Sequence, residues 1–112
     1  MVRIEVVLDE EGLLVSCGVS GHAGAGPRGS DVVCAAVSVL VRAAVRTLSG
    51  REGIRVRGDA PERGAFWLET DYSAAGRERL SAVGAFLLEG LRSVTESYPE
   101  YCRMSIHTER RK

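Results

Sequence analysis

The sequence predicts a single α+β domain in which a mainly antiparallel sheet packs against two helices, in the order β-β-α-β-β-α-β. Stretches of alternating apolar and polar residues near both ends of the chain predict strands, and two longer segments with apolar residues at helical spacing predict the helices. A length of 112 residues suits one domain, and neither repeats nor linkers divide it. We therefore expect residues 1–112 to fold as one unit.

The chain begins with a predicted hairpin. Residues 2–8 alternate between apolar and polar side chains, as a strand with one buried face does. Asp9-Glu10-Glu11-Gly12 is typical of a turn, and residues 13–20 alternate again. The alternation places Cys17 on the inward face of the second strand.

A glycine-rich segment and a long apolar helix follow. Residues 21–30 contain four glycines and one proline, which predicts a loop that can be mobile. Ser30 or Asp31 then caps a predicted helix that runs to about Ser49 and stops at Gly50. Its polar residues fall on one narrow stripe, so most of its surface is expected to be buried against the sheet, with a second subunit as a further candidate for covering it.

The second half of the chain contains three further predicted strands and a second predicted helix. Two short strands are expected at residues 54–57 and 66–70, joined by a turn, and a helix is expected at about residues 74–97. Residues 101–108 alternate and close the predicted sheet as its last strand. Three residues of that strand are expected to point inward: Cys102, Met104 and Ile106.

Composition argues against several classes of function. Fifteen basic and fifteen acidic residues give a formal net charge of zero, so no global field favours nucleic acid or an acidic membrane. The sequence starts directly with strand residues and has no apolar run long enough to span a bilayer. The three cysteines form no C-x-x-C pair. We therefore expect a cytoplasmic protein with free thiols and neither a membrane nor a direct nucleic-acid partner.

Cys34 and His22 are the residues that predict catalysis. Cys34 is expected in the first turn of the first helix, where unpaired amides and the positive end of the helix dipole stabilise a thiolate. His22 lies twelve residues earlier, at the other end of the glycine-rich loop, and the loop can fold its imidazole back over the helix N-terminus. The same amides can hold the oxyanion of a tetrahedral intermediate.

A purely structural role for Cys34 stays open at this point, because cysteine is among the most buried residue types. Cys17 and Cys102 fit such a role, since both lie on the inward faces of predicted strands. Cys34 also lies on an apolar helix, and only the nearby His22 favours the catalytic interpretation. His107 falls on the outward face of the last strand and is expected at the surface.

Two further residues flank Cys34 on the predicted helix. Asp31, three residues earlier, favours a helix cap, with orientation of His22 as the alternative. Ser38 lies one turn later on the same face, where its hydroxyl can bond to the helix backbone or tune the sulfur. The sequence does not choose between these roles.

No cofactor is predicted. Gly24-Ala25-Gly26-Pro27-Arg28-Gly29 formally matches G-x-G-x-x-G, but this loop is long, contains proline and lies outside a βαβ unit, which argues against nucleotide binding. Cys17, His22 and Cys34 lack the paired short spacing and the fourth ligand that are typical of a metal site.

One stretch of the sequence resembles a known family. Gly21-His22-Ala23, followed by Gly29-x-Asp31-x-Val33-Cys34-Ala35-Ala36-Val37-Ser38, is similar to the motif of the bacterial ribosomal-processing cysteine protease family, Prp. The motif covers about eighteen positions, 21 to 38, and the chain length and element order are similar throughout.

The resemblance implies a small homodimeric protease with a His–Cys dyad and no cofactor. Such enzymes remove an N-terminal extension from a large-subunit ribosomal protein, cutting after aromatic or large apolar residues. Cys34 would be the nucleophile and His22 the general base, with Asp31 and Ser38 close to the dyad as supporting residues. The loop that contains Gly24, Gly26 and Gly29 would cover the site until substrate orders it.

Two other functions compete with a cysteine endopeptidase that acts on a ribosomal protein precursor. One is a non-catalytic ribosome-associated binding module in which Cys34 is merely buried. The other is a thiol-redox protein, which the absence of a partner cysteine within a few residues disfavours.

Overall fold

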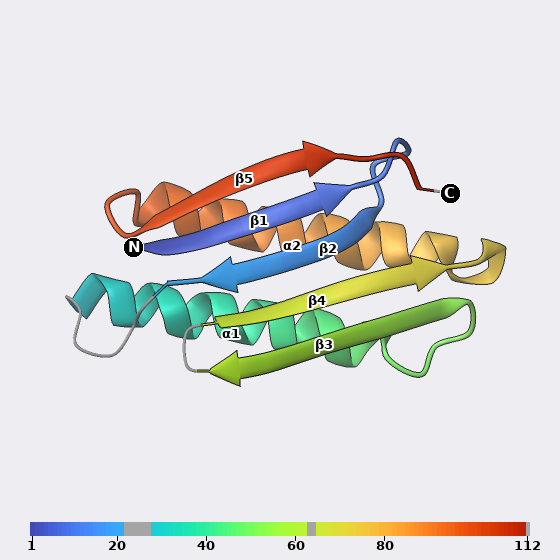
Figure 1. The fold of residues 1–112 in the computed structure, drawn as a ribbon, viewed down its shortest axis with the longest axis horizontal. Helices are drawn as coiled ribbons and strands as arrows, with labels where there is room; N and C mark the ends of the chain where they lie inside the picture. Colours follow the sequence, from blue (N-terminus) through green and yellow to red (C-terminus); the bar gives the residue numbers. More distant parts are fainter. Residues whose placement is uncertain (22–27, 63–64, 112) are drawn as a thin grey trace.

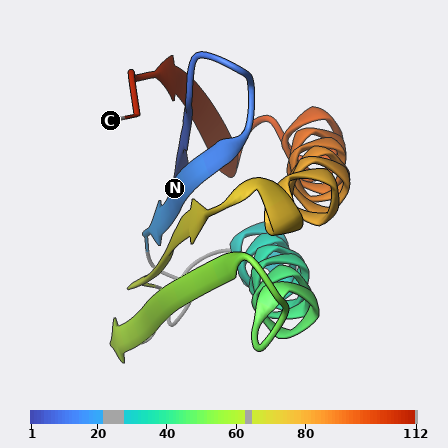
Figure 2. The ribbon, with the colours of Figure 1, turned by 90° about the vertical axis from the view of Figure 1, so that its right-hand side faces the viewer.

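The computed structural model describes residues 1–21, 28–62 and 65–111. Five strands form one sheet, and two helices lie against it (Figure 1). Seen after a turn of 90°, both helices cover the same face of the sheet, so that the opposite face is open (Figure 2). These two layers confirm the predicted α+β fold.

The elements follow the predicted order. The strands are β1 (Val2–Leu8), β2 (Leu14–Ser20), β3 (Ile54–Glu62), β4 (Ala65–Tyr72) and β5 (Cys102–Thr108). The helices are α1 (Arg28–Leu48) and α2 (Arg77–Ser97), and one 3-10 turn, Ala74–Gly76, precedes α2. The strand order in the sheet is β3-β4-β2-β1-β5, and every neighbouring pair is antiparallel except β1 and β5, which run parallel.

The core lies between the sheet and the helices because alternate strand residues face that way. In β1 these residues are Val2, Ile4 and Val6, and none is more than 1% exposed. The helices contribute apolar residues at three- and four-residue spacing, as amphipathic helices do. The most deeply buried of them are Val33, Val37 and Leu48 in α1 and Leu80, Leu87 and Leu91 in α2.

The first helix starts earlier than predicted. It begins at Arg28 rather than after a cap at Ser30 or Asp31, and it ends at Leu48. Both predicted caps therefore lie inside the helix, so the capping prediction is wrong. The prediction treated Gly29 as part of the loop, but one glycine costs a helix only about 1 kcal/mol and does not stop it.

The strands of the second hairpin are longer than predicted. Gly58 and Asp59 were expected in the turn, but they continue the antiparallel register of β3 opposite Leu68 and Trp67 of β4. Gly58 suits this place because a Cβ there would lie 2.9 Å from the Trp67 carbonyl oxygen. Pairing with a neighbouring strand has overridden the local turn signal of glycine and aspartate.

The last strand differs from the prediction at one residue. Cys102 is 2% exposed and Met104 is half-buried, as predicted, but Ile106 is 41% exposed. β5 lies at the edge of the sheet with β1 as its one neighbour, so its residues lack the cover that a second flanking strand gives. Within the described residues, neither helix has the length and apolarity needed to cross a membrane.

Candidate active site

Cys34 lies at the margin of the buried face of α1. The preceding residue, Val33, is fully buried, and the following residue, Ala35, is exposed. Cys34 itself retains 9% of its surface. Cys34 therefore belongs to the core cluster but is less completely buried than Val33, a position that suits a nucleophile supported by packing.

The prediction that Cys34 lies in the first helical turn is wrong. Counting from Arg28, Cys34 is the seventh residue of α1. Only the first four N–H groups of a helix lack an intrahelical partner, and these belong to residues 28–31. The dipole effect also fades beyond the first turn. The helix N-terminus therefore offers a thiolate at Cys34 less stabilisation than the sequence predicted.

Ser38 supports the backbone of Cys34. Its hydroxyl donates a hydrogen bond to the Cys34 carbonyl oxygen at 2.7 Å, one helical turn away. A hydroxyl has a single proton, so this bond leaves none to donate to the sulfur. Of the two roles that the sequence left open, the structure therefore favours the bond to the helix backbone.

Cys17 and Cys102 are sealed inside the core. They are 1% and 2% exposed, and all three cysteines are free thiols. Burial raises the pKa of the Cys17 thiol to about 12 and also raises the pKa of Cys102. Both shifts disfavour the thiolate, which agrees with the predicted structural role of these two cysteines.

The other predicted site residues are placed only in part. His22, Gly24 and Gly26 lie outside the described residues. Gly29 and Asp31 lie in the first turn of α1, so Asp31 is one helical turn before Cys34. The structure therefore brings Asp31, Cys34 and Ser38 onto one stretch of helix, while the contact between Cys34 and His22 stays a prediction.

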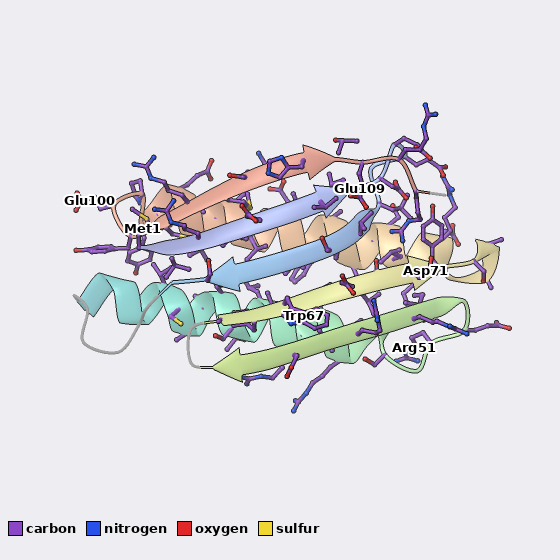
Figure 3. All side chains as sticks on the ribbon, in the orientation of Figure 1. Met1, Arg51, Trp67, Asp71, Glu100 and Glu109 are labelled. Atoms are coloured by element: carbon purple, nitrogen blue, oxygen red, sulfur yellow. The ribbon has the colours of Figure 1, made fainter. Side chains whose placement is uncertain are left out.

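Both ends of the loop that contains His22 lie at one end of the molecule. Figure 1 shows β2 ending and α1 beginning there. Met1 lies at the same end (Figure 3). Gly21, the last described residue before His22, has a φ of +123° and lies against the backbone of Met1. Sequence reasoning assigned no role to Gly21, although a glycine directly before a candidate base was a usable signal.

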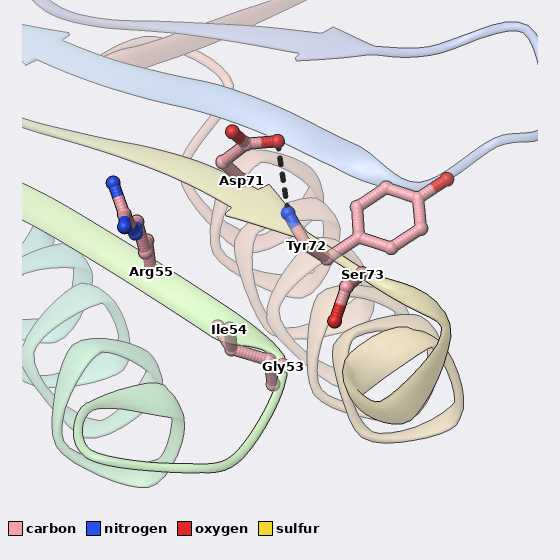
Figure 4. A pocket seen from close by; sticks show the side chains of 6 residues that line it. All are labelled: Gly53, Ile54, Arg55, Asp71, Tyr72 and Ser73. Carbon is pink, nitrogen blue, oxygen red and sulfur yellow. Dashed lines mark hydrogen bonds between the residues drawn. The ribbon is translucent and has the colours of Figure 1, made fainter.

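A hollow of about 400 Å³ lies at the opposite end of β3 and β4 (Figure 4). Its lining residues are Gly53, Ile54, Arg55, Asp71, Tyr72 and Ser73. Asp71 accepts a hydrogen bond from the Tyr72 amide at 2.9 Å. The lining holds neither a cysteine nor a histidine, so it offers no thiol nucleophile for acyl transfer. Among the residues that the structure describes, no group of three or more His, Cys, Asp or Glu side chains is arranged to hold a metal.

Comparisons with known proteins point to one family. The profile of the family described as "Cysteine protease Prp" matches residues 1–103. The fold is similar to that of an essential ribosomal processing protease Prp from S. aureus in complex with a substrate peptide, with a TM-score of 0.79 and 21% identity over 95% of this chain and 99% of that chain. It is also similar to SMU.848 from Streptococcus mutans, with a TM-score of 0.77 and 27% identity over 97% of this chain and 96% of that one. No curated protein sequence gave a significant match.

Proposed function

Because this chain belongs to the cysteine protease Prp family, we propose that it removes the N-terminal extension of a large-subunit ribosomal protein precursor, with Cys34 as nucleophile and His22 as general base. Membership of the family makes the chain a cysteine endopeptidase. The placement of Cys34 is the observation that carries the choice of nucleophile, because it is the least buried of the three cysteines, 9% exposed against 1% for Cys17 and 2% for Cys102. The ribosomal substrate is supported by the S. aureus protease, which is described as a ribosomal processing enzyme.

The proposed reaction needs only the dyad and water. His22 takes the proton of the Cys34 thiol, and the thiolate attacks the carbonyl carbon of the scissile peptide bond. The tetrahedral oxyanion collapses to a thioester as the C–N bond breaks, and the imidazolium gives its proton to the leaving amine. His22 then accepts a proton from water, whose oxygen attacks the thioester carbonyl carbon. The C–S bond breaks, the extension leaves with a new carboxylate, and the imidazolium returns its proton to the Cys34 thiolate.

Three further features complete the proposal. Ser38 holds the carbonyl of Cys34 and so fixes the backbone that carries the sulfur. Asp31, one turn earlier, supports the dyad from the first turn of α1. The segment between His22 and α1, which contains Gly24 and Gly26, orders over bound substrate, as the family resemblance implies, and Gly29 lies where this segment enters the helix.

The active form is proposed to be a cytoplasmic homodimer. An apolar hollow of about 200 Å³ is lined by residues of both α1 and α2, including Leu40, Ala43 and Phe86. Phe86 is 72% exposed, and Val39 on the neighbouring helix is 59% exposed. Large exposed apolar side chains beside a hollow are typical of an association surface, and they support a second copy at this face.

Cleavage of the cognate precursor tests the proposed function. The purified chain is incubated with the full-length large-subunit ribosomal protein precursor, and intact masses are followed with time. We expect one cut that releases the N-terminal extension, and none with Cys34→Ala or His22→Ala. Cys102→Ala is the matched control, because it removes a thiol that is 2% exposed, and it should still cleave. Cleavage by Cys34→Ala would overturn the assignment.

A further inference from the structure

Gly21 leaves the sheet beside the first residues of the chain. Ser20 is the last residue of β2 and pairs with Arg3 of β1, so Gly21 comes next to Met1 and Val2. The φ of Gly21 is +123°, in the region that L side chains rarely adopt. The chain thus turns out of the sheet at Gly21, one residue before His22.

A side chain at residue 21 would collide with backbone. A Cβ built on Gly21 lies 2.2 Å from the Met1 carbonyl oxygen, 2.8 Å from the Val2 Cα and 3.0 Å from the Met1 carbonyl carbon. Backbone atoms cannot move aside by changing rotamer, as a flexible side chain can. Any residue other than glycine must therefore shift one of the two segments.

The N-terminal segment is the one that is held in place. The Val2 amide donates a hydrogen bond to the Tyr101 carbonyl oxygen at 2.8 Å, and Val2 pairs with Cys102 of β5. Val2 is 1% exposed, so its side chain is anchored in the core as well. A substitution at Gly21 is therefore expected to displace residue 21 and whatever follows it.

We propose that Gly21 is a positioning residue for His22: it packs against the Met1 backbone and so fixes the place and direction in which the chain leaves the sheet. This inference rests on the proposed function, because it takes His22 as the base. Gly21 has no side chain that could take part in the reaction, so in this role it acts through its neighbour. Displacing a catalytic group by about 1 Å can lower the rate about 100-fold, so a one-residue connection is short enough to matter.

Gly50 provides a matched control. It also has a positive φ, +73°, but a Cβ there meets no atom within 4 Å. Gly50 lies just beyond the C-terminal end of α1, whereas the proposed site lies near its N-terminal end. Gly50→Ala thus introduces the strain of a positive φ without a collision and without a connection to His22.

The first experiment compares kinetics in the two variants. The substrate is a peptide that spans the N-terminal cut site of the cognate precursor, and thermal unfolding is measured in parallel. We expect Gly21→Ala to lower kcat by about 100-fold with little change in KM. Gly50→Ala should lose thermal stability yet keep the wild-type kcat. A kcat for Gly21→Ala equal to that of Gly50→Ala would overturn the inference.

The second experiment changes the other side of the contact and does not depend on the folding of Gly21→Ala. A chain that starts at Val2, released from a cleavable fusion, lacks the Met1 carbonyl, and N-acetylation of Val2 puts a carbonyl back in that place. Lys112 is the one lysine, so acetylation has few competing amines. We expect kcat to fall in the chain that starts at Val2 and to recover after acetylation. An unchanged kcat, or a loss that acetylation does not reverse, would overturn the inference.

Alkylation separates this inference from the proposed function. Iodoacetamide near neutral pH should modify Cys34 faster than Cys17, and both His22→Ala and Gly21→Ala should slow it. If Cys34 of the wild-type chain reacts no faster than Cys17, the proposed function fails. If Cys34 reacts fast in both the wild type and Gly21→Ala, the proposed function stands and the role of Gly21 is refuted.

Discussion

Replacing Arg111 by alanine should destabilise the folded protein by about 2–4 kcal/mol, since it breaks a largely buried ion pair and charge-assisted hydrogen bonds. The guanidinium donates to the carbonyl oxygens of Thr70 at 2.8 Å and Leu14 at 3.0 Å, and to a carboxylate oxygen of Asp9 at 3.3 Å. It also lies over the Tyr72 ring, 5.0 Å from its centre. One side chain therefore ties the end of the chain to β2, β4 and the first turn.

The size of the expected loss of stability follows from the burial of Arg111 and Asp9. The side chain of Arg111 is 19% exposed and that of Asp9 is 2% exposed, so water compensates little for the lost contacts. Removing one partner of a buried ion pair costs about 3–5 kcal/mol. The position near the chain end reduces this, because a terminal segment can fray and admit water. For a domain of this size, a loss of about 3 kcal/mol corresponds to a fall in Tm of roughly 10–15 °C.

Thermal and urea unfolding measure the effect, and the neighbouring arginine supplies the control. Arg110 is 90% exposed and lies 3.6 Å from the carboxylate of Glu10, so Arg110→Ala should change stability by less than about 0.5 kcal/mol. Arg111→Lys should fall between wild type and Arg111→Ala, since it keeps the charge and loses the forked donors. Equal Tm values for Arg110→Ala and Arg111→Ala would refute the reasoning.

The acid dependence of stability should follow Asp9. Burial by itself raises the pKa of this carboxyl, but hydrogen bonds from the Leu13 and Glu11 amides and from Arg111 and Tyr72 together lower it below the ordinary 3.8. A lowered pKa in the folded state gives stability that is present above the unfolded pKa and is lost as pH falls through the folded value. Urea unfolding of Asp9→Asn should therefore show a weaker loss of stability below about pH 4. A wild-type slope in that variant would contradict this assignment.

Three further outcomes are expected. In a time course with iodoacetamide at pH 7.5, followed by peptide mass spectrometry, Cys34 should be modified in the folded protein, whereas Cys17, with a pKa of about 12, should react only after unfolding. Ser38→Ala removes the hydrogen bond to the Cys34 carbonyl oxygen and should therefore lower kcat with little change in KM. Steady-state kinetics that show a change in KM alone would contradict this. Phe86→Glu should give a monomer in sedimentation analysis, whereas Ile106→Glu, which changes a residue that is 41% exposed on β5, should leave the dimer intact.

The sequence predicted the fold well because its signals are periodic and local. Alternation over residues 2–8 and 13–20, and helical spacing in the two apolar segments, identify the layers without knowledge of contacts. The prediction was wrong where a contact with residues distant in the sequence determines the local structure. Gly58 continues β3 because Leu68 lies opposite it, and Ile106 is exposed because β5 ended up at the sheet edge.

The candidate site was predicted unevenly for the same reason. The free, buried states of Cys17 and Cys102 followed from their place in alternating strands. Cys34 was correctly expected in the first helix, but it lies about one turn further from the start of that helix than predicted. Helix ends are hard to predict because they depend on weak local preferences. The contact of Gly21 with Met1 and that of Arg111 with Leu14 could not be predicted from the sequence, because each joins segments far apart along the chain.

The parallel pair of β1 and β5 couples the first strand in the sequence to a strand that is synthesised about a hundred residues later. Val2 is fixed by Tyr101 and Cys102, so the segment against which Gly21 packs gains its second support only after residues 101–108 have left the ribosome. Contacts of such long sequence separation form late in folding. If Gly21, His22 and Cys34 have the roles proposed above, a nascent chain should therefore stay inactive until residues 101–108 have left the ribosome.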